Sequence, residues 1–224
     1  MTDLTERLLA QARRFQESGA TPVTPRPAAT VLLLRPAATG FEVYLLRRAA
    51  SMAFASGVYA FPGGSVDPRD ADGDPLPGRW AERLGRSERE AQAVVRAAVR
   101  ETAEETGVRL DPADLVPWRR WITPEFEPRR YDTYFFVAAL PPGQEPADVS
   151  GEADRTEWLS PAEALRRFES GRILMLPPTS VTLRELSAYD SVEAVLAAGS
   201  TRDAATPVLP RVEQAPDGTA RLVY

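Results

Sequence analysis

Short runs of hydrophobic residues, bounded by polar or turn-forming residues, recur along the chain, and each such run predicts a β-strand. Residues 29–35 and 41–48 are rich in Val, Leu and Tyr and flank a turn that contains Pro and Gly, so they predict a β-hairpin. Residues 131–140 predict a longer strand and residues 156–160 a shorter one. Residues 119–130 are rich in Arg and Pro, and we expect mostly loop there.

The clearest helix signal lies between Ser87 and Gly107. Ser87 has the side chain of an N-cap, and Glu90 three positions later completes a capping box. The helical pattern continues to about Thr106. Gly107 then takes the left-handed conformation at a helix end without strain. We therefore predict one long helix that ends in acidic residues.

Other segments predict shorter elements around this helix. Residues 1–15 predict an amphipathic helix, residues 161–169 a helix with Ser160 as its N-cap, and residues 177–199 one or two helices. Residues 67–86 are rich in Asp, Pro and Gly and are interpreted as an inserted loop. The C-terminal tail predicts a hairpin that turns on the sequence APDG.

The segment 56–66 ends in Pro62, Gly63 and Gly64. Two consecutive glycines indicate a tight turn or a place where the backbone closely approaches another group.

Length and charge suggest a globular protein of ordinary composition. The chain has 224 residues, of which 43% are hydrophobic and 26% charged, which suits one sizeable domain with appendages. A formal net charge of −5 disfavours nucleic acid as a general partner, because nucleic-acid binders have a basic balance. No apolar run approaches the roughly 20 residues that cross a bilayer, and the acidic N-terminal stretch does not resemble a signal peptide. We therefore expect a cytoplasmic protein without a membrane partner.

Three residue types are missing, and their absence excludes several kinds of chemistry. The sequence contains no Cys, no His and no Lys. Disulfides, thiolate nucleophiles, His-based triads, His-ligated zinc, P-loop lysines and Schiff bases are therefore excluded. If the chain is an enzyme, carboxylates carry the proton and metal chemistry, and arginines bind anions.

The predicted long helix gathers acids where its own dipole disfavours them. On a helical wheel, Glu101, Glu104 and Glu105 fall in one arc beside the expected core face, and Glu90 falls in the same arc. The negative end of the helix dipole penalises each of these carboxylates by roughly 0.3–1 kcal/mol, and Glu101 and Glu105 also repel each other. A solvated acidic face is the ordinary alternative. A hard divalent cation, Mg²⁺ or Mn²⁺, would remove the conflict because it prefers oxygen ligands.

These residues also carry a family resemblance. The pair Gly63-Gly64 followed by RETAEETGV at 100–108 resembles the Nudix box of the Nudix hydrolases. The resemblance implies an α+β Nudix fold, an α/β/α sandwich with a mixed central sheet, over residues 28–170 with 67–86 inserted. Residues 1–27 would form an N-terminal helix and linker. Residues 171–224 would form a C-terminal extension packed on the same domain.

The resemblance also implies an activity and residue roles. Nudix hydrolases cleave a diphosphate linkage in nucleoside-diphosphate-X substrates with Mg²⁺ or Mn²⁺. Carried over to this sequence, the metal ligands are Gly63 through its carbonyl and Glu101, Glu104 and Glu105. Either a box glutamate or Glu152, in a late loop, would orient the attacking water, although Glu152 is equally well interpreted as an ordinary loop acid. Arg100 would orient a glutamate through a bidentate pair.

The sequence departs from the family pattern at two places. The interval between the glycine pair and Arg100 is far longer than in typical members. The first box glutamate is replaced by Gln92, which falls on the apolar side of the predicted helix, so we expect Glu90 to take part of its place. These departures leave the number of metal ions open.

The segment before the glycine pair partly resembles the signature of coenzyme A diphosphatases, so CoA or acyl-CoA is the favoured substrate. Arg48, Ala49, Gly57 and residues 61–64 match that signature, whereas Ala53 and Leu46 replace two of its polar positions. Further candidates for substrate binding are two arginines for phosphate, aromatic rings for stacking and a glycine for close approach: Arg129, Arg130, Phe126, Tyr131, Trp121 and Gly64. Aromatic residues at such positions are more often part of the core than ligand contacts.

Other functions stay open at this stage. NADH, ADP-ribose and nucleoside triphosphates compete as substrates. A Nudix-fold ligand sensor without turnover is a second class, and RNA cap hydrolysis a third that the acidic charge disfavours. A homodimer is also conceivable, since many relatives pair.

Overall fold

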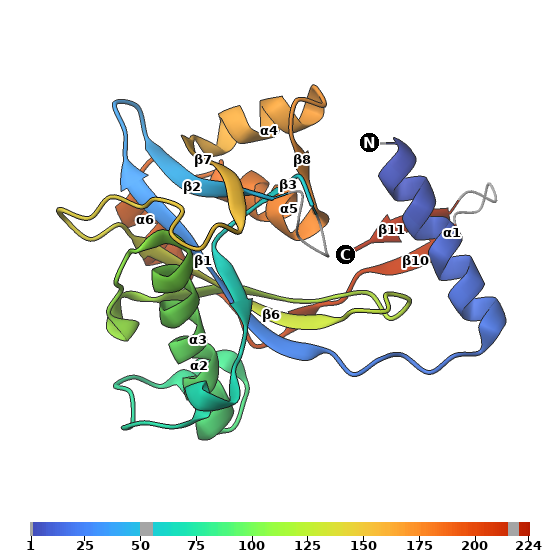
Figure 1. Cartoon of the computed structure of the whole chain (residues 1–224), viewed down its shortest axis with the longest axis horizontal. Helices are drawn as coiled ribbons and strands as arrows, with labels where there is room; N and C mark the ends of the chain where they lie inside the picture. The colour runs from blue at the N-terminus through green and yellow to red at the C-terminus, as the bar shows by residue number, and fades with distance from the viewer. Residues whose placement is uncertain (1, 50–55, 215–219) are drawn as a thin grey trace.

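The computed structural model describes residues 2–49, 56–214 and 220–224, and in these ranges one mixed sheet organises the chain. Its strand order is β8-β3-β2-β1-β6-β5-β9, with β4 paired to β1 and β7 paired to β2 (Figure 1). The strands are β1 (Arg26–Pro36), β2 (Phe41–Arg48), β3 (Val58–Ala60), β4 (Gly63–Ser65), β5 (Val116–Ile122), β6 (Tyr131–Ala139), β7 (Ala153–Leu159), β8 (Leu174–Met175) and β9 (Pro207–Val208). A separate hairpin joins β10 (Arg211–Gln214) to β11 (Ala220–Val223).

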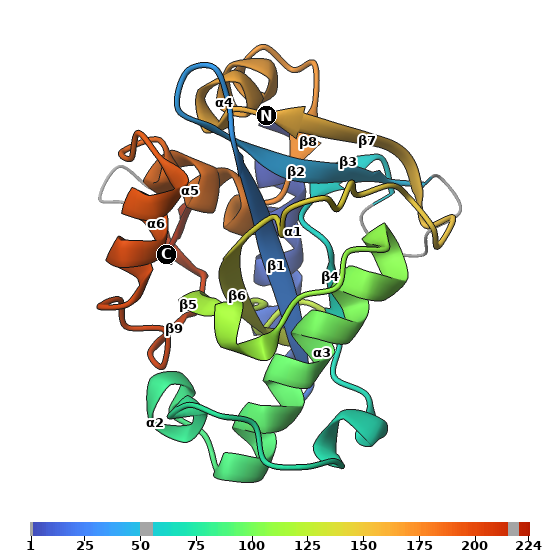
Figure 2. The ribbon, with the colours of Figure 1, turned by 90° about the vertical axis from the view of Figure 1, so that its left-hand side faces the viewer.

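Helices lie on both faces of this sheet, as the predicted α/β/α sandwich requires (Figure 2). The α-helices are α1 (Thr2–Ser18), α2 (Trp80–Leu84), α3 (Glu88–Thr106), α4 (Pro161–Glu169), α5 (Pro177–Leu186) and α6 (Val192–Gly199), with short 3-10 turns η1 (Pro68–Ala71) and η2 (Pro112–Asp114). β1 serves both layers because its side chains alternate. Val31 and Leu33 pack with α2 and α3, and Leu32 and Leu34 pack with α4, α5 and α6.

Strand β1 lies at the centre of the sheet and forms the predicted hairpin with β2. It pairs antiparallel with β2 through Leu34 and Val43, and parallel with β6 from Arg26 to Leu34. Because both faces of β1 are covered by helices, its middle is a continuous apolar run rather than a strict alternation. The predicted hairpin and the predicted strand at 131–140 are both confirmed.

Helix α3 has the predicted ends. The Ser87 hydroxyl accepts the Glu90 N–H, and the Glu90 carboxylate in turn accepts the Ser87 N–H. Gly107 has φ of 74° and donates its N–H to the Ala103 carbonyl. The helix therefore ends where the sequence predicts, at the buried Thr106, with Gly107 as its C-cap.

Helix α1 and the hairpin β10–β11 form an appendage beside the main body (Figure 1). Gln11 Nε2 of α1 donates to the Phe126 carbonyl at 3.1 Å and to Glu127 at 3.3 Å. The Tyr224 ring, after β11, lies 5.6 Å from the ring of Trp121 in β5. The two strands of the predicted tail hairpin are present, and its predicted turn lies outside the described residues.

Two sequence predictions need correction. Residues 119–122 belong to β5 rather than to a loop, and a β-bulge between Pro117 and Arg119 breaks the alternation that would have revealed the strand. The segment 67–86 is also not wholly loop, because it contains η1 and α2. Trp80 is 2% exposed, so burial of one large side chain stabilises α2 although the surrounding sequence favours turns.

Candidate functional site

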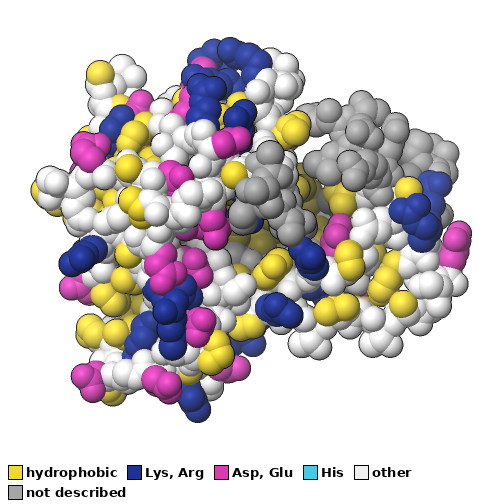
Figure 3. Space-filling model, viewed as in Figure 1, with side chains coloured by type: hydrophobic (Ala, Val, Ile, Leu, Met, Phe, Trp, Pro, Cys, Tyr) yellow, Lys and Arg dark blue, Asp and Glu magenta, His cyan; other side chains and the backbone are white. Residues whose placement is uncertain are grey.

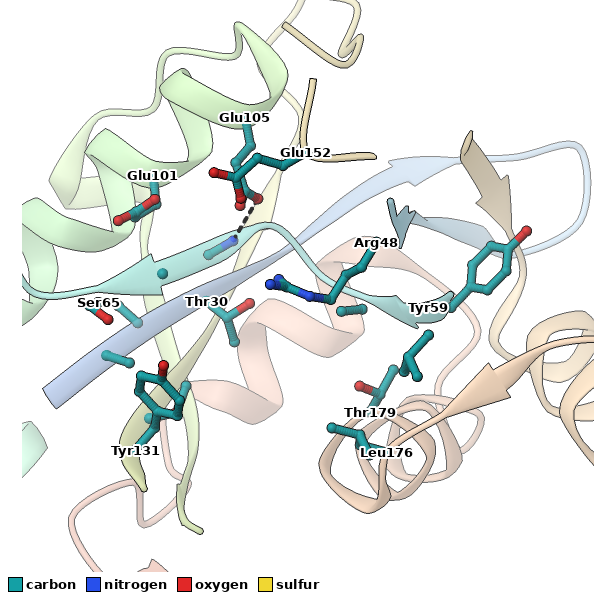
Figure 4. A pocket seen from close by; sticks show the side chains of 17 residues that line it. Thr30, Arg48, Tyr59, Ser65, Glu101, Glu105, Tyr131, Glu152, Leu176 and Thr179 are labelled. Atoms are coloured by element: carbon teal, nitrogen blue, oxygen red, sulfur yellow. Dashed lines mark hydrogen bonds between the residues drawn. The ribbon is translucent and has the colours of Figure 1, made fainter. Parts of the chain in front are cut away.

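A pocket of about 450 Å³ opens between α3, β4 and the ends of β1 and β2 (Figure 4). Two acids of α3 and one acid of the loop before β7 line it together with Arg48 at the end of β2. Figure 4 shows the carboxylates of Glu105 and Glu152 close to each other, with Glu101 farther along α3. The structure therefore brings these candidate residues into one space: Arg48, Gly63, Gly64, Glu101, Glu105, Tyr131 and Glu152.

The glycine pair lets β4 pass tightly between β1 and α3. Gly63 has φ of +155°, and a Cβ built there would lie 2.3 Å from the Ala29 carbonyl oxygen, so only glycine fits. The Gly63 N–H donates to Glu105 Oε2 at 3.0 Å. Gly64 lies directly under the Glu101 carboxylate. The close backbone approach predicted from the glycine pair is thus confirmed on both sides of the strand.

The acids of this pocket disfavour one another's charge. The pKa of Glu105 is raised to about 8, mainly by burial and also by the carboxylates of Glu101 and Glu152, whereas the Gly63 hydrogen bond and the positive charge of Arg48 oppose the shift. Burial also raises the pKa of Glu101, with contributions from Glu104 and Glu152 against the opposing effect of Arg100. The site holds more negative charge than its own cations compensate.

Arg100 supplies part of the compensation that α3 needs. Its Nε and Nη2 donate to the two oxygens of Asp70 at 3.0 and 2.8 Å. Its Nη1 donates to Glu101 at 2.8 Å and to Glu104 at 2.9 Å, and Nη2 also donates to the Ser65 carbonyl. The bidentate partner of Arg100 is therefore Asp70 of the insertion, which is 4% exposed, rather than a glutamate of the box.

Glu104 lies outside the lining of the pocket, although it shares Arg100 Nη1 with Glu101. It is exposed, and Arg69 of η1 donates to its carboxylate at 3.0 Å in addition to the bond from Arg100. Within the described residues, no three Asp, Glu, His or Cys side chains lie close enough together to form a complete cation site.

The donor set still fits a hard divalent cation. Glu101, Glu105 and Glu152 offer only oxygen atoms. Burial, together with the neighbouring carboxylates, raises the pKa values of Glu101 and Glu105, so their charged forms are disfavoured without a cation. A Mg²⁺ or Mn²⁺ ion keeps several water ligands and therefore needs only a few carboxylates.

Several predicted substrate contacts lie elsewhere. Arg130 is buried and donates to the carbonyls of Val23 and Thr123, so it fastens the chain before β1 to the loop before β6. Arg129 is exposed, and neither it nor Phe126 lines the pocket. Trp121 is buried and packs against Tyr224.

The departure from the family pattern at Gln92 also has a structural explanation. Gln92 is 8% exposed and accepts hydrogen bonds from the Leu76 N–H and from Arg96, so it anchors the inserted segment to α3. Glu90 does not take its place, because its carboxylate is used in the capping box and it lies eleven residues, roughly 16 Å along the helix, before Glu101.

Asp70 is a site residue that was not predicted from the sequence. The stretch DPRD contains a signal, since Asp67 and Asp70 form a capping box around η1. That signal gives the turn, but only the packing of the insertion against α3 places Asp70 opposite Arg100. Thr30, Tyr59 and Thr179 also line the pocket, and nothing in their spacing indicated it.

Comparison with known proteins gives consistent matches. A model of the NUDIX domain matches residues 24–177. The solved structure of a NUDIX hydrolase from Alicyclobacillus acidocaldarius is 28% identical, superposes with a TM-score of 0.66, and covers 78% of this chain and 96% of its own.

Three curated proteins are also similar over parts of their lengths. The acyl-coenzyme A diphosphatase NUDT19 of Homo sapiens is 37% identical over 81 residues, and that of Xenopus laevis is 33% identical over 76 residues. These matches cover 34% and 32% of this chain and 20% of each relative. The putative nudix hydrolase 7 of Caenorhabditis elegans is 27% identical over 72% of this chain and 60% of its own length. The aligned part of this chain thus spans a fifth to three fifths of these relatives.

Proposed function

This chain belongs to the NUDIX family, and we propose that it hydrolyses the diphosphate linkage of a nucleoside-diphosphate-X substrate with the help of Mg²⁺ or Mn²⁺. One observation carries the proposal. Glu101 and Glu105 of α3, Glu152 of the loop before β7 and Arg48 of β2 all line one pocket beside the glycine pair. Acids for a cation and an arginine for phosphate are the side chains that diphosphate hydrolysis needs, and the chain has no His, Cys or Lys for other chemistry.

The cation would be held by the oxygen atoms of Glu101 and Glu105, with the Gly63 carbonyl and Glu104 as the further ligands that the family resemblance implies. When bound, such an ion neutralises phosphate charge and lowers the pKa of a coordinated water. The Gly63 N–H fixes the Glu105 carboxylate, and Arg100 fixes that of Glu101. Both acids are therefore oriented before the substrate arrives.

The remaining groups suit the substrate and the water. The Arg48 guanidinium points into the pocket (Figure 4), and its planar fork matches two phosphate oxygens. The Glu152 carboxylate lies near that of Glu105 in the same view. We propose that Glu152 is the general base that accepts a proton from the attacking water. Glu105 is the competing base, because its carboxylate lies beside that of Glu152 in the same pocket.

Coenzyme A or acyl-CoA is the favoured substrate. The proposal rests on the partial CoA-type signature around Arg48 and on the similarity to two acyl-coenzyme A diphosphatases. NADH, ADP-ribose and nucleoside triphosphates are the alternatives that a substrate panel separates.

The experiment is hydrolysis of this panel by the full chain with Mg²⁺ or Mn²⁺, with products identified by chromatography. Release of 3′,5′-ADP from CoA is the expected result. Glu101→Gln and Glu152→Gln should each lower kcat at least 100-fold, whereas Glu145→Gln, an exposed acid outside the pocket, should leave it unchanged. Binding of panel members without any turnover would refute the hydrolase and favour a ligand sensor.

A further inference from the structure

A second cavity of about 260 Å³ adjoins the carboxylate pocket. The two cavities share lining residues at their junction, among them Thr30, Arg48, Gly63 and Tyr131. We call the second cavity the apolar compartment, because Leu8, Phe61, Trp121, Ile122 and Phe135 line it with prolines of the α5 N-terminus and Pro210. A molecule that places phosphates beside Arg48 can extend from there into the compartment.

The compartment lies between the sheet and the appendage of α1 and the hairpin β10–β11. Figure 3 shows a recess between these two parts with hydrophobic side chains on its walls. Gln11 ties α1 to the β5–β6 loop, and Tyr224 packs against Trp121. Both Leu8 and Pro210 fall outside residues 24–177, so segments beyond the family domain help to enclose this cavity.

Several polar side chains of the compartment already have partners within the protein, whereas the buried Nε1 of Trp121 has none among the described residues. The Thr30 hydroxyl donates to the Pro62 carbonyl, and the Thr123 hydroxyl donates to the Tyr131 carbonyl. The Glu127 carboxylate accepts from Gln11. A ligand group here contacts mostly carbon atoms. Polar atoms of the ligand would lose their hydrogen bonds to water and gain few partners in exchange.

The rings of the compartment are also packed against one another. Phe61 and Phe135 meet edge to face at 6.3 Å with an interplanar angle of 88°, and Trp121 is tilted by 56° against Tyr224. A planar base stacks best between exposed, parallel ring faces, which these pairs do not provide. The shape and the chemistry therefore favour an aliphatic chain over a nucleobase.

We propose that the apolar compartment binds an aliphatic chain attached to the phosphates of the substrate, and that α1 and the segment at Pro210, just before β10, thereby set substrate choice. The orientation rests on the proposed function, since it places the phosphates between Arg48 and the carboxylates. Substrates whose X group is a flexible, weakly polar chain are then favoured over those whose X group is a sugar.

The test is binding of n-alkyl monophosphates of two to twelve carbons, measured by calorimetry with the full chain. These probes contain no diphosphate linkage, so the result does not depend on turnover. Affinity should rise about fourfold for each buried methylene. The affinity should level off near eight or nine carbons. A group the size of a water molecule takes up about 30 Å³, so a cavity of about 260 Å³ holds on the order of that many methylenes.

Matched variants locate the effect. Leu8→Trp fills the compartment from α1 and should make the affinity series level off at a shorter chain, whereas Ala10→Trp adds the same side chain at an exposed position of α1 and should change nothing. Leu8→Trp should also raise the KM for CoA at least tenfold and that for ADP-ribose less than twofold.

The outcomes separate the two proposals. Affinity that does not depend on chain length, or an equal loss in the two tryptophan variants, overturns the compartment whatever the protein hydrolyses. A chain-length series that Leu8→Trp shortens, together with no hydrolysis of any panel member, supports the compartment and refutes the enzymatic activity.

Discussion

Gly64 lies directly beneath the carboxylate of Glu101. A Cβ at position 64 would lie 2.5 Å from Glu101 Cδ and 2.6 and 2.7 Å from its two oxygens, far inside van der Waals contact. The clash involves the far end of a flexible side chain, so the backbone can stay in place while the carboxylate moves. The second glycine of the pair is therefore tied to the position of one acid.

Gly64→Ala should thus remove function and spare the fold. We expect at least a 100-fold loss of kcat with a small change in melting temperature, because misplacing one group by about 1 Å costs on the order of 10²-fold. Gly199→Ala is the matched control, since its Cβ would lie 2.7 Å from Val116 Cγ1, also a side-chain end, but far from the pocket. Full activity in Gly64→Ala, or equal losses in both variants, would show that the position of Glu101 does not matter.

Glu105 should make the metal-free protein less stable as pH rises. Its pKa is about 8 in the folded chain against 4.5 for an unperturbed group, so the folded state binds more protons between those values. Stability contributed by the protonated form is therefore lost as pH rises from about 4.5 to 8, by an amount on the order of a few kcal/mol.

Glu105→Gln isolates this effect. The variant should be more stable than the parent at pH 8 without metal, equally stable near pH 4.5, and should lose the thermal stabilisation that Mn²⁺ gives the parent. Denaturant titrations at several pH values measure the difference. Parallel pH profiles for parent and variant would contradict the raised pKa.

Asp70 should act on the site through Arg100. Asp70→Asn removes the charge that holds the guanidinium, so we expect about a 10- to 100-fold loss of kcat with KM little changed, as for other residues that orient ligating groups. Asp72→Asn, which removes an exposed partner of Arg89, serves as the control. If Asp70→Asn lowers the melting temperature but keeps the parent's kcat at temperatures where it is folded, Asp70 stabilises the fold and does not act on the site.

Arg69 should compete with a cation for Glu104. Its Nη2 donates to Glu104 Oε1 in an exposed pair, and such pairs contribute roughly 0–1 kcal/mol. If Glu104 is a ligand, as the family resemblance implies, Arg69→Ala should tighten Mn²⁺ binding by up to about fivefold in calorimetry. Arg79→Ala, which breaks an exposed pair with Glu82, should have no effect. Unchanged Mn²⁺ affinity in Arg69→Ala would argue that Glu104 stays outside the site.

Local patterns predicted most of the secondary structure because capping and periodicity are properties of neighbouring residues. The capping box at Ser87, the stop at Gly107 and the Pro-initiated helix after Ser160 are all present where predicted. β5 was missed because a bulge shifts its register and arginines occupy two of its positions. No local rule reveals such a strand, since β6 supplies its partners from later in the chain.

The candidate site was predictable only where spacing along one helix determines it. The grouping of Glu101 with Glu105 follows from the helical period. Glu104 instead pairs with Arg69, and Asp70 is buried against Arg100 because residues 67–86 pack on α3. Neither contact follows from the positions of residues on a helical wheel. Arg130 resembled a phosphate binder because the sequence does not reveal that backbone carbonyls surround it.

The segment between β4 and α2 is the kind of surface connection that usually tolerates changes of length during evolution and in protein engineering. Here it is different, because the inserted turn η1 supplies the counter-charge for an arginine that touches the acids of α3. Shortening this connection would leave that guanidinium without its most buried acceptor. The length of this segment is therefore constrained by the contact between Asp70 and Arg100 of α3.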